Sequence, residues 1–138
     1  MDLENTVFHK IISGELPSYK LYEDDDFVVI LDRFPAAAGH TLILPKIPAK
    51  DIFSLSDESA ARLYPLAKRV ATAVKAATGC DGINIIQNNG AASGQAVFYF
   101  HLHILPRFEG DDIRIKTTQH DPPTEELAQI QNKIKASL

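Results

Sequence analysis

NNGAASGQAVFYFHLHILPR, residues 88–107, is the most informative part of this chain about both its fold and its chemistry. Within it, residues 96–105 are mostly aromatic and aliphatic, which favours a β-strand that ends at Pro106. Alternate residues of a strand share a face, so Tyr99, His101 and His103 are expected to point the same way. The opposite face carries the residues expected in apolar packing, Phe98, Phe100, Leu102 and Ile104.

Two histidines on one face can perform chemistry that a single histidine cannot. One imidazole can attack or take up a proton while the other donates a hydrogen bond to an anion. The loop before the strand, residues 88–95, favours an anion site, because glycine lets backbone N–H groups approach a phosphate. Gly94 gives that room, and Asn88 and Gln95 add amide donors.

The same histidines allow two other interpretations. A histidine on a strand is often only a hydrogen-bonded structural residue, although two in an otherwise apolar strand both need partners. A His-x-His pair can also supply two zinc ligands, with His40, His9 or a carboxylate as the third. The spacing alone excludes neither interpretation.

The rest of the chain predicts an α+β fold with an antiparallel sheet, since strands lie before and after one long helix. A short N-terminal helix is expected to begin at Asn5 and end at Gly14. The long helix is expected to begin at Ser56 and end at Gly79, with a kink at Pro65. A C-terminal helix is predicted over 124–136, and strands are predicted over 19–22, 27–31, 40–44, 83–87 and 96–105.

Composition limits the class of protein. The chain has 138 residues, of which 45% are hydrophobic, and this suits a single domain spanning 1–138. The net charge of −4 argues against a protein that coats nucleic acid, and one cysteine rules out an intrachain disulfide. The apolar runs are too short for a membrane span and the acidic start is unlike a signal peptide, so we expect a cytoplasmic protein.

Residues 95–107 resemble the signature of the histidine triad (HIT) family, in which histidines alternate with apolar residues. Three further blocks resemble the family in the right order: FHKIISGELPS at 8–18, LD at 31–32 followed by GHTLILPK at 39–46, and NIIQNNG at 84–90. Together the blocks cover about residues 6–107. The resemblance implies an α+β nucleotide-binding fold, usually a homodimer with one sheet continuous across both subunits.

The resemblance also implies a hydrolase that releases a purine nucleoside monophosphate from a P–N or P–O–P linkage. No cofactor is expected, because histidine and backbone donors would hold the phosphate and the residues demand no divalent cation. His101 corresponds to the nucleophile and His40 to a supporting histidine, while His103 and the backbone at Gln95 and Ala96 would hold the phosphate oxygens. Asp32 would accept the ribose hydroxyls, and Asn88 would contact the ribose or a phosphate. The base would lie against Val7, Phe8, Ile11, Leu16, Ile30 and Leu31, although plain core packing would suit these six residues equally well.

The chain departs from the family pattern at the first triad position, where Tyr99 replaces a histidine. Many bacterial-type members hold a structural zinc at positions that correspond here to Thr6, His9, Pro48 and Tyr99. At most one of these four can serve as a ligand, so we predict that no metal is bound there. If the first histidine instead supports the nucleophile, the chain would be a nucleotide-binding or interaction module with little catalysis.

Overall fold

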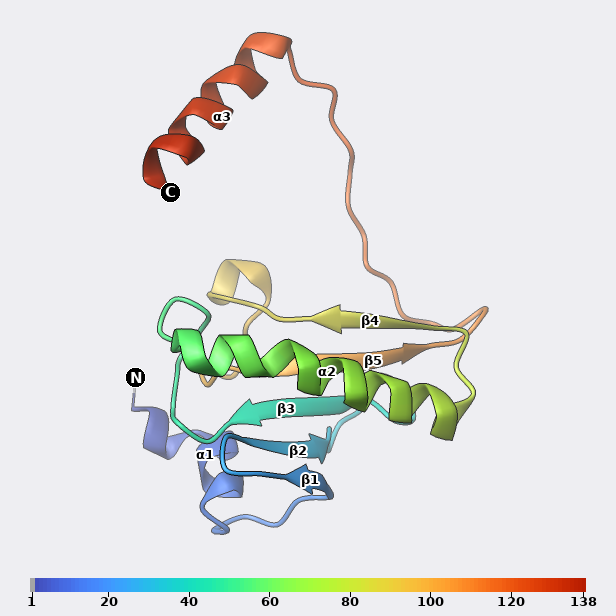
Figure 1. Cartoon of the computed structure of the whole chain (residues 1–138). Helices are drawn as coiled ribbons and strands as arrows, with labels where there is room; N and C mark the ends of the chain where they lie inside the picture. The colour runs from blue at the N-terminus through green and yellow to red at the C-terminus, as the bar shows by residue number, and fades with distance from the viewer. Residues whose placement is uncertain (1) are drawn as a thin grey trace.

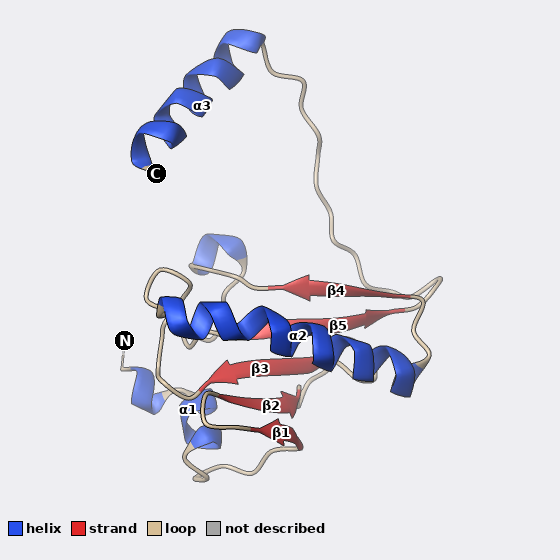
Figure 2. Cartoon of the chain, in the orientation of Figure 1, coloured by secondary structure: helices blue, strands red, loops and turns tan. Residues whose placement is uncertain are grey.

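Five strands form one antiparallel sheet (Figures 1 and 2). This computed structural model describes residues 2–138. The α+β class, the antiparallel sheet and the three helices expected from the sequence are confirmed. The strands are β1 (Lys20–Glu23), β2 (Phe27–Leu31), β3 (Thr41–Pro45), β4 (Gly82–Ile86) and β5 (Leu102–Arg107). Their order across the sheet is β1-β2-β3-β5-β4. The helices are α1 (Val7–Ile12), α2 (Asp57–Thr78) and α3 (Thr124–Ser137), with short 3-10 turns η1 (Leu3–Asn5) and η2 (Ala91–Ser93).

Each face of the sheet carries its own apolar core, because side chains alternate along a strand. The helix α2 runs across one face (Figure 1), where its buried stripe, including Leu66 and Val70, contacts Val29 and Ile43 of the central strands. The helix α1 covers part of the other face through Phe8. The second core contains Phe8, Val28, Ile30, Leu42, Leu44 and Tyr99.

The ends of α2 are those predicted from the sequence. Ser56 is the N-cap, and its hydroxyl accepts a hydrogen bond from the N–H of Ser59 at 3.1 Å. Gly79 ends the helix in the left-handed conformation, with φ of 68°. Between these caps α2 continues through Pro65 as one helix of 22 residues.

The prediction that Asn5 begins the first helix is wrong by one residue. Thr6 is the N-cap of α1, and its hydroxyl accepts a hydrogen bond from the N–H of His9 at 3.2 Å. Asn5 belongs to the preceding 3-10 turn, where its side-chain amide donates to the carboxylate of Asp2. Asparagine and threonine are both favoured N-caps, so the sequence alone did not show whether Asn5 or its neighbour Thr6 caps the helix.

The strand predicted over 96–105 is wrong at both ends, because β5 covers Leu102–Arg107 and continues through Pro106, which was expected to end it. The N–H of Phe100 donates to the carbonyl of Ala49 at 2.7 Å, so the backbone before β5 bonds to the loop after β3 instead of to a strand. The alternation of side chains continues through this irregular segment. Tyr99 lies in the core under α1, and Phe100 lies in the core under α2.

The C-terminal helix α3 stands apart from the sheet at the end of an extended segment, residues 112–123 (Figure 1). None of its 14 residues is buried. Among residues 2–138, no helix is long and apolar enough to cross a membrane.

Candidate active site

A cleft of about 910 Å³ opens on the α1 side of the sheet. Its walls are α1 and the turn that follows it, the end of β2, and the loop that leads into β5. This cleft is lined by all but two of the residues that the sequence analysis assigned to the site. They are Val7, Phe8, Ile11, Leu16, Ile30, Leu31, Asp32, Asn88, Gly94, Ala96, His101 and His103.

The two exceptions, His40 and Gln95, are both buried. The side-chain oxygen of Gln95 accepts a hydrogen bond from the N–H of Gly90 at 2.7 Å, and its amide group donates to the carbonyls of Lys50 and Val97. The side chain of Gln95 therefore braces the loop before β5. The sequence analysis expected the amide of Gln95 to donate to a phosphate, but this amide already donates to the two carbonyls and is not available.

The cleft also contains residues that the sequence analysis missed. Phe34 is 84% exposed at the cleft, and the guanidinium carbon of Arg33 lies 5.3 Å from the centre of its ring. Leu42 is paired with Ile30 across β2 and β3, so the register of the two strands would have identified it. The missed residues are Pro17, Ser18, Tyr19, Arg33, Phe34, Leu42 and Val97.

His101 is fixed at the cleft by its own backbone neighbourhood. Its Nδ1 lies 2.7 Å from the carbonyl oxygen of Tyr99, which can only accept a hydrogen bond. Nδ1 therefore carries the proton, and Nε2 keeps its lone pair. The edge of the imidazole lies against the ring of Phe8, with 4.8 Å between ring centres, which holds the ring in place.

A second pair of histidines has an equally defined proton arrangement. The N–H of Ala36 donates to Nδ1 of His40 at 3.1 Å, so the proton of a neutral His40 lies on Nε2. That Nε2 lies 2.9 Å from Nδ1 of His103 and donates to it. His103 must then carry its own proton on Nε2. Two adjacent imidazoles thus present opposite groups, a lone pair on His101 and an N–H donor on His103.

Burial keeps these imidazoles neutral. Desolvation is the main cause that lowers the pKa of His101, and it also lowers the pKa of His40. The pKa of His103 falls to about 4, because burial is reinforced by repulsion from His101 and His40. The carboxylate of Asp32 opposes all three shifts but does not overcome them. At neutral pH the site therefore has uncharged histidines.

Among residues 2–138, the one group of side chains that could hold a metal ion consists of Asp32, His40 and His103. Their potential ligand atoms all lie within 4.8 Å of one another. The carboxylate of Asp32 lies 3.6 Å from Nε2 of His40. A metal ion at this position would have to replace the hydrogen bond between the two histidines. His9, the other candidate third ligand, is not part of the group.

The side chain of Tyr99 is fully buried, and its hydroxyl donates to the carbonyl of Pro45. Burial raises the pKa of this phenol, so it stays protonated. The hydroxyl of Thr6 donates to the carbonyl of Leu3. Two hydroxyl groups that already have partners do not form a zinc site with His9, so these residues do not fit the structural zinc of the HIT resemblance.

Comparison with known proteins gives consistent matches. The HIT domain family matches residues 13–110. The protein named Protein hit from Bacillus subtilis is 36% identical, covering 98% of this chain and 95% of that protein. The crystal structure of a HIT family protein from Bacillus anthracis has a TM-score of 0.93 and 36% identity, with 99% of each chain covered. Adenylylsulfatase HINT3 of Arabidopsis thaliana is 44% identical, covering 76% of this chain and 53% of that longer protein.

Proposed function

The chain belongs to the HIT family, and from this membership we propose that it is a nucleotide-binding hydrolase with His101 as its nucleophile. The proposal depends mainly on one observation at His101. Because Nδ1 donates its proton to the carbonyl of Tyr99, Nε2 keeps its lone pair, and His101 lines a cleft large enough for a nucleotide. The relative named adenylylsulfatase supports a substrate with an adenylyl group.

The first chemical step is attack by Nε2 of His101 on the α-phosphorus of the substrate. The new N–P bond replaces the bond to the leaving group, which departs with its electron pair and, when it is an amine, takes up a proton from solvent water. The imidazole becomes cationic in this step, and the carbonyl of Tyr99 stabilises the charge through the Nδ1–H bond. A neutral His101 is needed at the start, and its lowered pKa supplies that form at neutral pH.

The second step is attack by water on the nucleotidyl-imidazole, which releases the nucleoside monophosphate and restores His101. In both steps negative charge builds up on the phosphate oxygens. The Nε2–H of His103 is placed to donate to them, because the hydrogen bond from His40 fixes its tautomer. His40 therefore acts as a positioning residue that contacts His103.

The rest of the cleft suits a purine nucleoside. Asp32, Asn88, Gly94 and Ala96 all line the cleft. We expect the carboxylate of Asp32 to accept the ribose hydroxyls, and Asn88 and the backbone at residues 94–96 to contact a phosphate group. The base would occupy the apolar end of the cleft. The residues proposed to contact it are Val7, Phe8, Ile11, Leu16, Ile30 and Leu31.

We also propose that the protein is a homodimer, in which the sheets of two copies join into one. Among residues 2–138, the strand β4 pairs with β5 alone and lies at an edge of the sheet, so its other side is available to pair with a second β4. Nucleotide substrates of this kind are met inside the cell, and we place the protein in the cytoplasm.

The test is hydrolysis of a fluorogenic adenosine 5′-phosphoramidate by the metal-free protein and by His101→Ala. We expect the substitution to lower kcat by at least about 1000-fold, because the covalent route is lost, while AMP still binds in a calorimetric titration. The variant His120→Ala is the control, since His120 is exposed and lies outside the cleft.

Other outcomes would contradict the proposal in distinct ways. If neither protein hydrolyses the substrate and AMP binds both, the chain is a nucleotide-binding module. Activity that requires added zinc would point to metal chemistry at Asp32, His40 and His103.

A further inference from the structure

The helix α3 has an apolar stripe with no partner in the part of the chain that the structure describes, residues 2–138. Leu127, Ile130 and Ile134 lie three and four residues apart, which places them on one side of the helix. Their exposed fractions are 54%, 49% and 55%, and Leu138 continues the stripe beyond the helix with 99% exposure. A 14-residue helix is only marginally stable alone in water, so a stable α3 requires a surface that covers this stripe.

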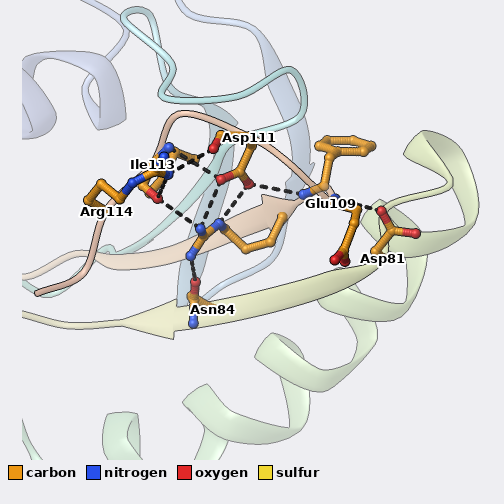
Figure 3. Close-up of polar contacts among 8 residues, drawn as sticks. Asp81, Asn84, Glu109, Asp111, Ile113 and Arg114 are labelled. Atoms are coloured by element: carbon orange, nitrogen blue, oxygen red, sulfur yellow. Dashed lines mark hydrogen bonds and ion pairs between the residues drawn. The ribbon is translucent and has the colours of Figure 1, made fainter.

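The direction in which the chain leaves the sheet is fixed. The guanidinium of Arg107, the last residue of β5, donates to both carboxylate oxygens of Asp111 at 2.8 and 2.9 Å. It also donates to the side-chain oxygen of Asn84 and to the carbonyl of Ile113. Figure 3 shows these partners around one point at the start of the extended segment. Residues 112–138, which we call the arm, therefore begin from a rigid base.

The position of the arm is shared with a solved relative. The arm is about one fifth of the chain. If the arms of two proteins took different positions relative to the sheet, only the remaining four fifths would superpose and the TM-score would stay at about 0.8. The Bacillus anthracis protein instead superposes with a TM-score of 0.93 over 99% of this chain. The arm therefore keeps its position in a protein that is 36% identical, although none of the residues of α3 is buried against the sheet. We infer that a surface outside this sheet holds it.

The surface beside the arm is suited to a second copy of this chain. Figure 1 shows α3 beyond the β4 edge of the sheet, on the side where the free edge of β4 would meet another molecule. Ile83 and Ile85 of β4 border a groove of about 710 Å³ that also contains Tyr64 and Pro65 of α2. An apolar groove, a free strand edge and an unpartnered apolar helix on one chain are complementary features of a twofold dimer.

We propose that two copies exchange their arms, so that the apolar stripe of each α3 lies on the body of the other copy. This inference rests on the homodimer proposed above and assigns a specific part of it to the arm. A copy joined at β4 lies in the space that the arm spans, and each arm then crosses the interface. The stripe on α3 contributes to the stability of the dimer, although it is far from the strand edges that join.

The test compares two double variants of the full chain by sedimentation equilibrium. Ile130→Asp with Ile134→Asp places two charges on the stripe, whereas Gln129→Asp with Asn132→Asp places the same charges on the opposite side of α3. We expect the stripe variant to raise the dimer dissociation constant by at least about 100-fold, since two isoleucines lose their apolar contacts. The control pair should leave it within about threefold.

A second measurement locates the arm. Chains labelled with ¹⁵N are mixed with unlabelled chains, allowed to exchange, and treated with a lysine-reactive cross-linker. We expect links from Lys133 or Lys135 of α3 to the body in mixed-isotope pairs. A wild-type dimer that the stripe variant leaves intact, or links only within one chain, would overturn the arm exchange and leave the homodimer standing. A wild-type monomer of 15.2 kDa at micromolar concentration would overturn both, while hydrolysis reports separately on the active site.

Discussion

Replacing Tyr99 with phenylalanine separates the two roles that residue 99 could have in this protein. The structure connects Tyr99 to the nucleophile only through its backbone carbonyl, which accepts the hydrogen bond from His101. The phenol points elsewhere and donates to the carbonyl of Pro45 in β3. Phenylalanine keeps the carbonyl and the buried ring and removes only the hydroxyl. We therefore expect Tyr99→Phe to lower stability and to leave catalysis almost unchanged.

The magnitude follows from burial. Tyr99 is fully buried, so losing the hydroxyl leaves the carbonyl of Pro45 without this donor and away from water. A buried acceptor left in that state costs about 1–3 kcal/mol of unfolding free energy. In a chain of this size the loss corresponds to a melting temperature lower by roughly 3–10 °C. The value of kcat should stay within about threefold of the wild type, because no contact with the transition state is removed.

The assay pairs urea unfolding with hydrolysis of the phosphoramidate on the same samples. Tyr19→Phe is the control for the unfolding measurement, since Tyr19 is 68% exposed and should lose little stability with the same chemical change. A kcat that falls more than about thirtyfold in Tyr99→Phe, with stability unchanged, would refute the reasoning. The hydroxyl would then act on the nucleophile, as the first histidine of the triad could.

Three further predictions concern the turn before β3, the histidines and the absent zinc. In Gly39→Ala, the new Cβ would lie 2.7 Å from Cγ2 of Thr78 at a backbone φ of +95°, so we expect a loss of about 1–3 kcal/mol in urea unfolding. Gly14→Ala, at a similar φ of +84° but with nothing within 4 Å of its Cβ, is the control that separates the contact with Thr78 from backbone strain. His103 has a pKa of about 4 in the folded protein against an ordinary 6.5, so the unfolded chain binds its proton first as the pH falls. Its contribution to stability should be complete above pH 6.5 and lost as the pH falls toward 4, and a variant His103→Asn measured over the same range should lose less. Elemental analysis of the purified protein should find no tightly bound zinc, and one zinc per chain would contradict the assignment at Thr6, His9, Pro48 and Tyr99.

The sequence was sufficient for elements whose signals are local. Apolar periodicity and strong caps identified α2 from Ser56 to Gly79, and the β-branched segment at 27–31 became β2 with the same bounds. The structure of the segment before β5 could not be predicted from such local signals. Its residues alternate like a strand, but the backbone bonds to the loop at Ala49, and that long-range contact leaves no periodic mark in the sequence.

The candidate site shows the same division. His101 was identified from its residue type and spacing, whereas Asp32 was identified only through the resemblance to the HIT family; both line the cleft. Arg33 and Phe34 line the cleft through the course of a loop, and Leu42 through strand register, and none of these can be obtained without the fold. The proton positions on His40 and His103 depend on the N–H of Ala36, a backbone donor with no signature in the sequence.

The separation of α3 from its own sheet has a consequence for the order of assembly. Since no residue of α3 is buried against that sheet, the sheet and α2 can complete their folding without it. That step involves one molecule, so its rate does not depend on protein concentration. Docking of the arm on a second copy is bimolecular and becomes faster as the concentration rises. Chains diluted during refolding would accumulate as folded bodies with free arms, and their exposed isoleucines make this the species most prone to aggregate.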